Sequence, residues 1–255
     1  MNLSSQRFDT IASNYVTSEV HGVSPTIARL HEVLGDERFE SVLDVACGAG
    51  HFGLSFSGRA EHLTAVDPSP RMRDAVRALA AERQLTVDTV DARAEALPFP
   101  DGTFDVTLCR LAAHHFTDVA KAISEMNRVT RPGGPIAIID LQGSDDPAAD
   151  ALNHEIELLH DPTHVRSYRE SDWKESLVGS GLSFELHSGQ LEFPGGLSVA
   201  RWCEISVSGA EAEAKIRSLL KGASPTTLSA IGIHTHDDEY YLSIRSILII
   251  ARKPP

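Results

Sequence analysis

Three glycines in VLDVACGAGHFGLSF (residues 42–56) have the spacing G-x-G-x-x-G: Gly48, Gly50 and Gly53. Such glycines follow a predicted strand, and they let the backbone turn sharply and approach a ligand without a Cβ in the way. Asp67 ends the next predicted strand, 19 positions after Gly48, where its carboxylate can accept both hydroxyls of an adenosine ribose. The pattern predicts a site for an adenosine-containing cofactor. These residues alone do not decide whether that cofactor is NAD or another one.

Three further features disfavour NAD. Asp44 lies inside the first predicted strand, where its carboxylate would oppose a pyrophosphate but could help hold a cationic ligand or the glycine loop. Asp91 follows the third strand, near where an adenine would lie, and NAD does not require it. Roughly 40 residues precede the glycine loop, whereas dinucleotide enzymes commonly open with this fingerprint.

Two adjacent histidines, His114 and His115 in LAAHHF, follow the fourth predicted strand. That strand should lie beside the first, at the point of a parallel sheet where ligands bind. Imidazole titrates near neutral pH, so one of the pair could act as a general base or orient a substrate. The alternative is that one packs and the other positions a loop.

Two other clusters of polar residues could bind a ligand. HDPTHVRSY (residues 160–168) groups two imidazoles, a guanidinium and a phenol after a predicted helix. These residues are as well explained by contact with a substrate as by a solvated loop. HTHDDE (residues 234–239) contains residue types that ligate divalent metals, but H-x-H before a strand is more typical of a polar loop. We therefore predict no metal site. The candidate substrate residues are His160, His164, Arg166 and Tyr168, and the rejected metal ligands are His234, His236, Asp237 and Asp238.

The elements that position these residues follow from the pattern of apolar residues. Five β-rich runs alternate with helical patterns through the first 140 residues, which predicts βαβ units and a parallel sheet. Residues 69–83 have the spacing of an amphipathic crossover helix. Residues 148–180 predict two helices, the second opened by Ser171. The five runs are SVLDVA, HLTAVD, LTVDTVD, FDVTLC and PIAIIDL.

The C-terminal third has a different pattern. FELHSGQLEF and YYLSIRSILIIARK each predict a strand, and the two are expected to form an antiparallel pair. About 40 residues between them, 194–238, predict helix around residues 211–221. So long an insertion in a compact domain is typical of a lid or substrate wall.

Composition limits the partners. The chain has 255 residues, 42% of them hydrophobic, and a formal charge of −13 with scattered Lys and Arg, so nucleic acid is not expected as a partner. Cys47, Cys109 and Cys203 form no C-x-x-C, which suits a reducing compartment. No apolar run is long enough to cross a bilayer. We expect a soluble, cytoplasmic protein without a membrane partner.

Four stretches, read in order, resemble a known family: LDVACGAG, TAVDPSPRM, DARAEALPFPDGTFDVTLCRLAAHHF and EMNRVTRPGGPIAIIDL. Over about residues 8–141 the chain is similar to the class I S-adenosylmethionine-dependent methyltransferases of type 11, which include the ubiquinone and menaquinone C-methyltransferase-like proteins. The resemblance implies a glycine loop under the methionine part of S-adenosyl-L-methionine, a ribose on Asp67 and an adenine between Asp91 and Ala92. It also implies that the Arg110 backbone meets the methionine amino group. The cofactor-binding residues expected are Asp44, Ala46, Cys47, Gly48, Gly50, Asp67, Pro68, Met72, Asp91, Ala92, Arg110 and Tyr15.

The implied fold is α/β: a Rossmann-like, doubly wound, seven-stranded and mostly parallel sheet with an antiparallel C-terminal strand, an N-terminal helical segment and a helical lid insertion. We expect one domain over residues 1–255. It comprises an N-terminal helical cap (1–40), a cofactor-binding core (41–141) and substrate-facing helices with C-terminal strands (142–255), the lid covering about 194–238. In RFDTIASNY, part of that cap, Phe8 and Tyr15 could close over the cofactor, or simply pack.

The implied activity is methyl transfer to an O, N or C atom of a small, natural-product-like or quinone-like molecule. Transfer from a sulfonium needs no acid for the leaving group, so alignment and desolvation can replace a base. The alternatives are a non-methylating S-adenosylmethionine-binding protein, a cyclase or decarboxylase on the same fold, and an NAD-dependent oxidoreductase. Pro135 after RPGG departs from the family pattern, and residues 142–239 match no substrate motif. The sequence is compatible with a homodimer but does not decide the oligomeric state.

Overall fold

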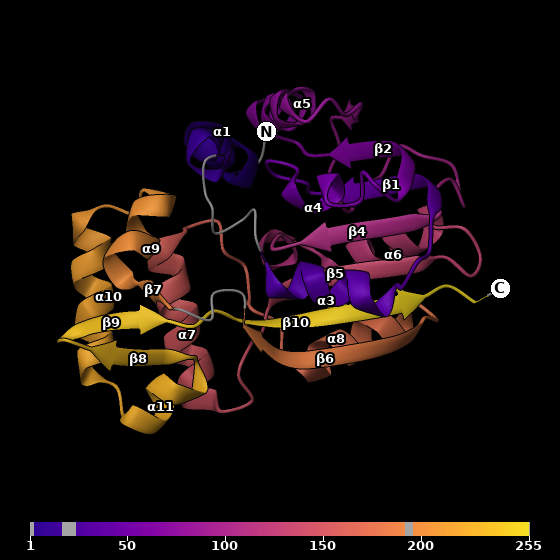
Figure 1. Ribbon diagram of the computed structural model, residues 1–255. Coiled ribbons are helices and arrows are strands. Elements are labelled where there is room, and N and C mark those ends of the chain that lie inside the picture. Colours follow the sequence, from indigo (N-terminus) through magenta and orange to yellow (C-terminus); the bar gives the residue numbers. More distant parts are fainter. Residues whose placement is uncertain (1–2, 17–23, 192–195, 255) are drawn as a thin grey trace.

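The larger sheet of the computed structural model, which describes residues 3–16, 24–191 and 196–254, has seven strands in the order β3-β2-β1-β4-β5-β10-β6 (Figure 1). Only β10 runs antiparallel to its neighbours, β5 and β6, so the predicted Rossmann-like sheet is confirmed. The strands are β1 (Phe39–Val45), β2 (Ala60–Val66), β3 (Asp88–Val90), β4 (Val106–Arg110), β5 (Pro135–Leu141), β6 (Ser183–Leu191) and β10 (Arg245–Arg252).

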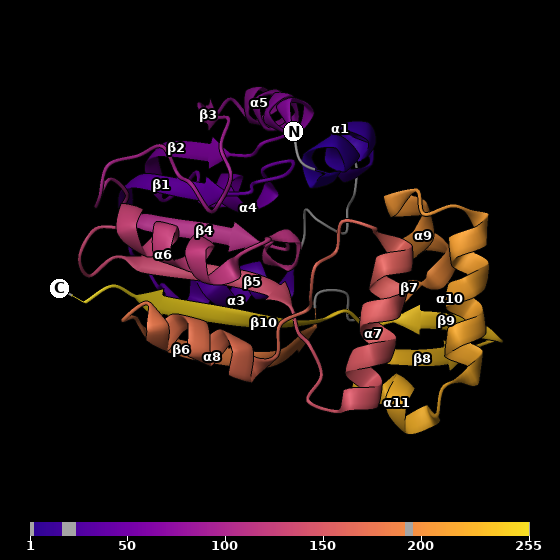
Figure 2. The ribbon, with the colours of Figure 1, turned by 180° about the vertical axis from the view of Figure 1, so that it is seen from behind.

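Helices cover both faces of this sheet. Alternate strand residues enter two apolar cores: in β5, Ala137 and Ile139 pack with α3, α4 and α5, while Ile136 and Ile138 pack with α6 and α8. Figure 2 shows α6 and α8 on the face opposite α3. Burial on both faces is what the continuous apolar runs of a parallel sheet require. The helices are α3 (Pro25–Val33), α4 (His51–Leu54), α5 (Pro70–Glu82), α6 (Val119–Val129) and α8 (Glu170–Gly179), with the 3-10 turn η1 (Ala113–His115) after β4.

Two predicted helix starts had different outcomes. Ser69 caps α5, its hydroxyl accepting from the Met72 backbone N–H at 3.1 Å, so the crossover helix is confirmed. The prediction that Ser171 opens the second later helix is wrong, because Arg169 is the N-cap of α8. The Asp172 carboxylate accepts from the Arg169 backbone N–H at 3.0 Å and closes the first turn.

The C-terminal strands pair as predicted, but YYLSIRSILIIARK is two strands rather than one. Its first part is β9 (Glu239–Leu242), which pairs with β7 (Leu197–Ser198) and β8 (Ile233–His236) in a second, three-stranded sheet. The H-x-H part of HTHDDE is therefore strand rather than loop, because it ends β8. A two-residue hairpin turn follows, in which Asp237 and Asp238 both have positive φ, and Glu239 begins β9.

The second sheet and four helices form a lobe with its own apolar core, so the predicted helical insertion also contains strands. In Figure 1 this lobe lies beside the carboxyl ends of the parallel strands. Within the described ranges, no helix is long and apolar enough to cross a membrane. The helices of the lobe are α7 (Pro147–His160), α9 (Val199–Ser206), α10 (Ala210–Gly222) and α11 (Pro225–Ala230), and its buried core contains Ile156, Val199, Trp202, Cys203, Ile216, Leu220, Ile233 and Leu242.

Candidate active site

A cavity of about 990 Å³, part of it open to solvent, lies at the carboxyl ends of β1, β2 and β4. Its walls are the glycine loop, the start of α5, the segment after β4 and, from the N-terminus, α1 (Leu3–Val16). Eight of the twelve expected cofactor-binding residues line it together: Asp44, Ala46, Cys47, Gly48, Asp67, Pro68, Met72 and Arg110.

The three glycines of the loop have three different surroundings. Gly48 has φ 51° and lines the cavity, and a Cβ there would meet no other protein atom within 4 Å. Gly50 has φ 85°, and its Cβ would lie 2.9 Å from both methyl carbons of Val76 in α5. A Cβ on Gly53 would lie 2.7 Å from Oδ2 of Asp44. Gly48 thus leaves room for a ligand, while the other two let the loop pack against the fold.

Two buried carboxylates hold the glycine loop. Oδ2 of Asp44 accepts from the Gly53 backbone N–H at 2.8 Å, and Oδ2 of Asp67 accepts from that of Gly48 at 3.1 Å. Oδ1 of Asp67 also accepts from the Ser69 N–H at 2.8 Å. Burial raises the pKa of Asp44 to about 7 and that of Asp67 to about 6. Each carboxylate oxygen has a second lone pair, so Asp67 can still accept hydrogen bonds from a ribose.

Where the adenine is expected, the residues that line the cavity are next to those predicted. Arg93, Ala94 and Glu95 line the cavity, while Asp91 and Ala92 do not. The Asp91 side chain is 69% exposed and pairs with Arg73 at 3.2 Å. Gly50 also lies outside the lining, so the direct cofactor contacts of these three expected residues stay predictions.

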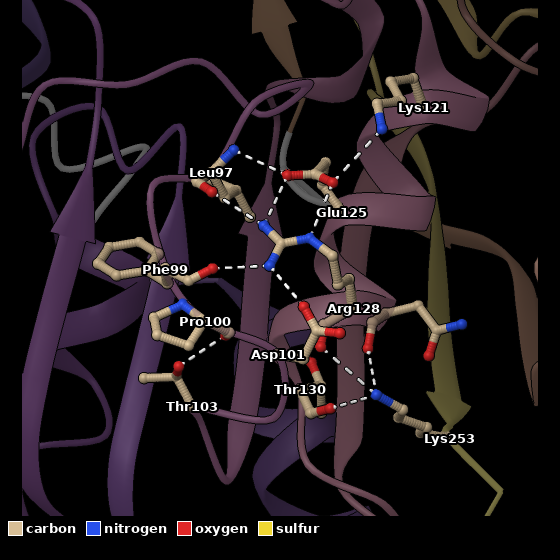
Figure 3. A network of polar contacts seen from close by, with 11 residues as sticks. Leu97, Phe99, Pro100, Asp101, Thr103, Lys121, Glu125, Arg128, Thr130 and Lys253 are labelled. Atoms are coloured by element: carbon tan, nitrogen blue, oxygen red, sulfur yellow. Dashed lines mark hydrogen bonds and ion pairs between the residues drawn. The ribbon is translucent and has the colours of Figure 1, made fainter.

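A network around Arg128 fixes the segment that leads away from this wall (Figure 3). Its guanidinium donates to the carbonyls of Leu97 at 2.9 Å and Phe99 at 2.6 Å. Glu125 pairs with Arg128 at 2.8 Å and accepts from the Leu97 N–H at 3.0 Å. The hydrogen bonds from Arg128 lower the pKa of Glu125 to about 2. Two residues of the motif EMNRVTRPGG, Glu125 and Arg128, thus hold the segment that follows the cavity wall, a role that its sequence did not indicate.

A second cavity, about 730 Å³ and partly open to solvent, adjoins the first and shares Phe8, Leu111 and His115 with it. Its walls combine imidazoles and carboxylates with apolar residues, and they come from both the core and the second lobe. The residues that line only this cavity are His114, Leu141, Glu157, His160, Asp161, His164, Leu197, Trp202, Ile205 and Ile244.

The two candidate catalytic histidines face different partners. Nδ1 of His114 lies 2.5 Å from Oδ1 of the buried Asp140, at the end of β5. Nδ1 of His115 lies 3.1 Å from the Thr163 carbonyl oxygen. Burial alone would lower the pKa of His114, but the Asp140 carboxylate raises it, and the balance is a raised pKa. Burial, together with the neighbouring His114, lowers the pKa of His115 to about 4.

Of the four expected substrate residues, two line the second cavity. The ring of His160 stacks on Trp202 with centroids 3.8 Å apart, and its Nε2 donates to the Trp202 carbonyl at 3.2 Å. His164 is 5% exposed, and among the described residues neither of its ring nitrogens has a hydrogen-bond partner. Arg166 instead pairs with two aspartates, and the ring of Tyr168 packs on Trp173, so neither reaches this cavity.

The N-terminal helix α1 lies between the two lobes and covers both cavities. Phe8 lines both, and its ring meets that of His115 edge to face at 5.1 Å. Arg7 donates to the Ser206 carbonyl of α9, while Ser5 donates to the Pro68 carbonyl at 3.2 Å. Tyr15, the other aromatic residue expected over the cofactor, lies at the end of α1, outside the side chains that the structure describes.

Across residues 3–16, 24–191 and 196–254, no group of three potential ligands is arranged to hold a metal ion. His234 of HTHDDE stacks on Tyr241 in the second sheet, away from both cavities. The sequence reasoning missed Asp140, Glu157 and Trp202, each of which lies on or beside the wall of the second cavity. These three residues come from β5, α7 and α9, and no spacing along the chain connects them.

Comparison with known proteins agrees with this geometry. A family model described as a methyltransferase domain matches residues 43–138. The Bacillus subtilis (strain 168) protein YcgJ, described as an uncharacterized methyltransferase, is 37% identical over 145 residues, which are 56% of this chain and 57% of that protein. A demethylmenaquinone methyltransferase of Deinococcus radiodurans is 36% identical over 101 residues, 39% of this chain and 42% of that one. The chain thus matches at most 57% of the length of these curated relatives.

Solved structures extend the likeness to most of the chain. The crystal structure of YcgJ has a TM-score of 0.82 at 28% identity, covering 90% of this chain and 98% of that one. The [4+2]-cyclase SpnF has a TM-score of 0.67 at 18% identity, covering 97% and 93%. Because SpnF shares the fold alone, the fold does not specify the reaction.

Proposed function

We propose that this chain, whose residues 43–138 match the methyltransferase domain family, transfers a methyl group from S-adenosyl-L-methionine to an O, N or C atom of a small molecule. The observation that carries this proposal is the pair of adjoining cavities that share Phe8, Leu111 and His115. A cofactor in the first cavity and an acceptor in the second would meet at this shared boundary, where an in-line displacement requires them.

The residues of the first cavity fit the cofactor. S-adenosylmethionine supplies an electrophilic methyl group when bound. Asp67 has lone pairs for the ribose hydroxyls, and Gly48 lets the backbone come close to the ligand without a Cβ. Asp44 does not suit a pyrophosphate, because its buried carboxylate lies against the glycine loop. Phe8 from α1 would exclude water from the reacting atoms.

The second cavity supports a small, natural-product-like or quinone-like acceptor. Leu197, Ile205 and Ile244 contribute apolar surface to a cavity that the imidazoles also line. Nucleic acid is a poor candidate because the chain has a formal charge of −13. His114 and His115 would orient the acceptor or take a proton from it, and His160 and His164 would contact it.

Transfer of a labelled methyl group tests this function. The protein is incubated with S-adenosylmethionine tritiated in its methyl group and with pooled small-molecule acceptors of the three atom types. We expect tritium in an acceptor together with an equal amount of S-adenosylhomocysteine. Calorimetric binding of S-adenosylhomocysteine without label transfer to any acceptor would instead support a non-methylating protein. Binding of NADH in its place would support an oxidoreductase.

A further inference from the structure

We infer that the acceptor atom is the oxygen of a weakly acidic hydroxyl group on a flat, uncharged skeleton, and that His114, held by Asp140, removes its proton. This inference rests on the proposed methyl transfer and narrows it to one acceptor class. It makes His114 the catalytic residue of the adjacent pair, and Asp140 a positioning residue that acts through it.

Asp140 fixes both the orientation and the tautomer of His114. Its Oδ1 lies 2.5 Å from Nδ1 of the imidazole, and its Oδ2 accepts from the His114 backbone N–H at 3.2 Å. A carboxylate accepts only, so the ring proton is on Nδ1 and the lone pair is on Nε2. Within the described part of the chain nothing hydrogen-bonds Nε2, and His114 lines the second cavity. A carboxylate behind an imidazole also stabilises the imidazolium that forms when a proton arrives.

His115 is the weaker base of the two. Its Nδ1–H donates to the Thr163 carbonyl, a neutral acceptor that stabilises an imidazolium less than a carboxylate does. Burial and the adjacent His114 keep it neutral at physiological pH, with a pKa of about 4. It borders both cavities, so its Nε2 can accept a hydrogen bond from the acceptor without taking the proton.

The groups that face His114 set its protonation. The carboxylates of Asp140, Glu157 and Asp161 raise its pKa against the effect of burial, and the rings of His115 and His164 lie 4.1 and 5.5 Å away, centroid to centroid. Burial raises the pKa of Glu157 to about 7. His114 is therefore free to take a proton only above its raised pKa.

The walls of the cavity disfavour a negatively charged skeleton. Asp161 would repel a carboxylate or phosphate, and so would Glu157 once it is ionised. The stacked pair of His160 and Trp202 offers a flat surface, with interplanar angle 10°, beside aliphatic side chains. The neutral His164 ring, whose nitrogens are buried without partners among the described residues, offers one donor and one acceptor, which suits an uncharged polar group.

The chemistry of the dyad favours oxygen. A free amine already has its nucleophilic lone pair, whereas a neutral hydroxyl is a poor nucleophile until its proton leaves. The O–H proton passes to Nε2 of His114 as the oxygen pair forms the bond to the methyl carbon. The carbon–sulfur bond breaks, and its electron pair stays on sulfur, which gives neutral S-adenosylhomocysteine. His114 then returns its proton to solvent, so one proton is released for each methyl ether formed.

Three matched compounds, 2-naphthol, 2-naphthylamine and 2-naphthoic acid, test the acceptor class with tritiated S-adenosylmethionine. The enzymes compared are the parent, His114→Gln, Asp140→Asn and His62→Gln, the last an exposed histidine of β2 that serves as the control. We expect the methyl ether of 2-naphthol as the main product, a loss of roughly 10² to 10⁴ in kcat for His114→Gln, and no change for His62→Gln. Labelling of the amine or acid, or C-methylation of the naphthol ring, would overturn the inference.

The pH profile tests Asp140. The parent rate should rise with pH through a pKa above the ordinary histidine value of about 6.5. Removing the carboxylate in Asp140→Asn should move this limb to lower pH and reduce kcat more than it changes KM. An unchanged limb with an unchanged rate would show that Asp140 does not act through His114.

If none of the three compounds is labelled, nitrogen-15 NMR of the histidine rings tests the role of His114 without turnover. In the complex with S-adenosylhomocysteine, His114 should show the Nδ1–H tautomer, a raised pKa that falls in Asp140→Asn, and a change at Nε2 on addition of 2-naphthol but not of 2-naphthoate. Absence of that change would overturn the inference. A parent protein that fails to bind S-adenosylhomocysteine would overturn the proposed function instead.

Discussion

At the scale of single residues, Asp67 has two tasks. It holds the backbone of the glycine loop through the Gly48 N–H, and it presents its remaining lone pairs to the cavity. Asp44, which lies behind it, contacts the loop at Gly53 and holds it from the other side. Substitutions at Asp67 should therefore act on cofactor binding both directly and through the loop that it holds.

We predict that Asp67→Asn weakens binding of S-adenosylhomocysteine at least tenfold, because hydrogen bonds to a charged carboxylate contribute about 1.5–3 kcal/mol. The exposed ion pair partner Asp74 provides the control, and Asp74→Asn should leave the dissociation constant unchanged. Calorimetry measures both. Asp91→Asn in the same series decides whether that exposed carboxylate contacts the adenine. If it does, the substitution should weaken S-adenosylhomocysteine binding by a similar factor. Unaltered affinity in folded Asp67→Asn would refute the ribose assignment.

The affinity for S-adenosylhomocysteine should fall as the pH drops through about 6. Burial raises the pKa of Asp67 to about 6, so below that pH the free protein carries a neutral carboxyl group, which accepts ribose hydrogen bonds less well. Above it the carboxylate is ionised and binding should be at its strongest. Titrations between pH 5 and 8 measure the slope, and Asp67→Asn should lack it. A slope that persists in this variant would assign the effect to another group.

At the scale of elements, the loop between β1 and α4 contains one glycine that leaves room for a ligand and another that allows the loop to pack against the fold. Gly48 and Gly50 both have positive φ, so alanine costs each of them backbone strain of about 1 kcal/mol. Only Gly50 would also drive its Cβ against Val76. The two substitutions form a matched pair.

Gly50→Ala should lower the free energy of unfolding by about 2–4 kcal/mol, since overpacking adds about 1–3 kcal/mol to the strain. Gly48→Ala should lower it by the strain alone and should weaken S-adenosylhomocysteine binding more, because its Cβ enters the cavity. Urea unfolding and calorimetry on both variants check the order. Equal losses of stability would mean that Val76 gives way to the added methyl group.

At the scale of the whole molecule, α1 ties the lobes together over the cavities. It contacts the core through Ser5 and Pro68, and the second lobe through Arg7 and Ser206.

Phe8→Ala should open the boundary between the cavities and weaken binding of S-adenosylhomocysteine about tenfold. It should lower the free energy of unfolding less than the same substitution of a core phenylalanine would. Phe99→Ala, outside both cavities, is the control. If Phe99→Ala weakened S-adenosylhomocysteine binding more than Phe8→Ala did, Phe8 would have only a packing role.

The sequence predicted the core of the molecule better than its second lobe. The alternation of strands and the spacing of Gly48, Gly50 and Asp67 are local signals, and the structure brings Gly48 and Asp67 together in one cavity while Gly50 packs behind it. Asp140 gave no such signal, because it meets His114 only when β4 and β5 lie side by side. The split between β9 and β10 was missed because both are apolar strands separated by only two residues.

The second lobe also explains why the acceptor could not be read from motifs. Trp202 and Glu157 are 45 positions apart in the chain, and both line this cavity only because α7 packs against α9. Arg166 and Tyr168, which lie within a few positions of His164, point to other partners. Neighbours along the chain are therefore a poor guide to neighbours in this cavity.

A crystal structure of the protein with S-adenosylhomocysteine tests the central claim most directly. The account predicts the ligand in the first cavity, with its ribose hydroxyls on Asp67, its methionine part against the Gly48 backbone, and its sulfur facing the boundary at Leu111 and His115. Ligand density outside this cavity, or within it but with the sulfur turned away from that boundary, would contradict the account.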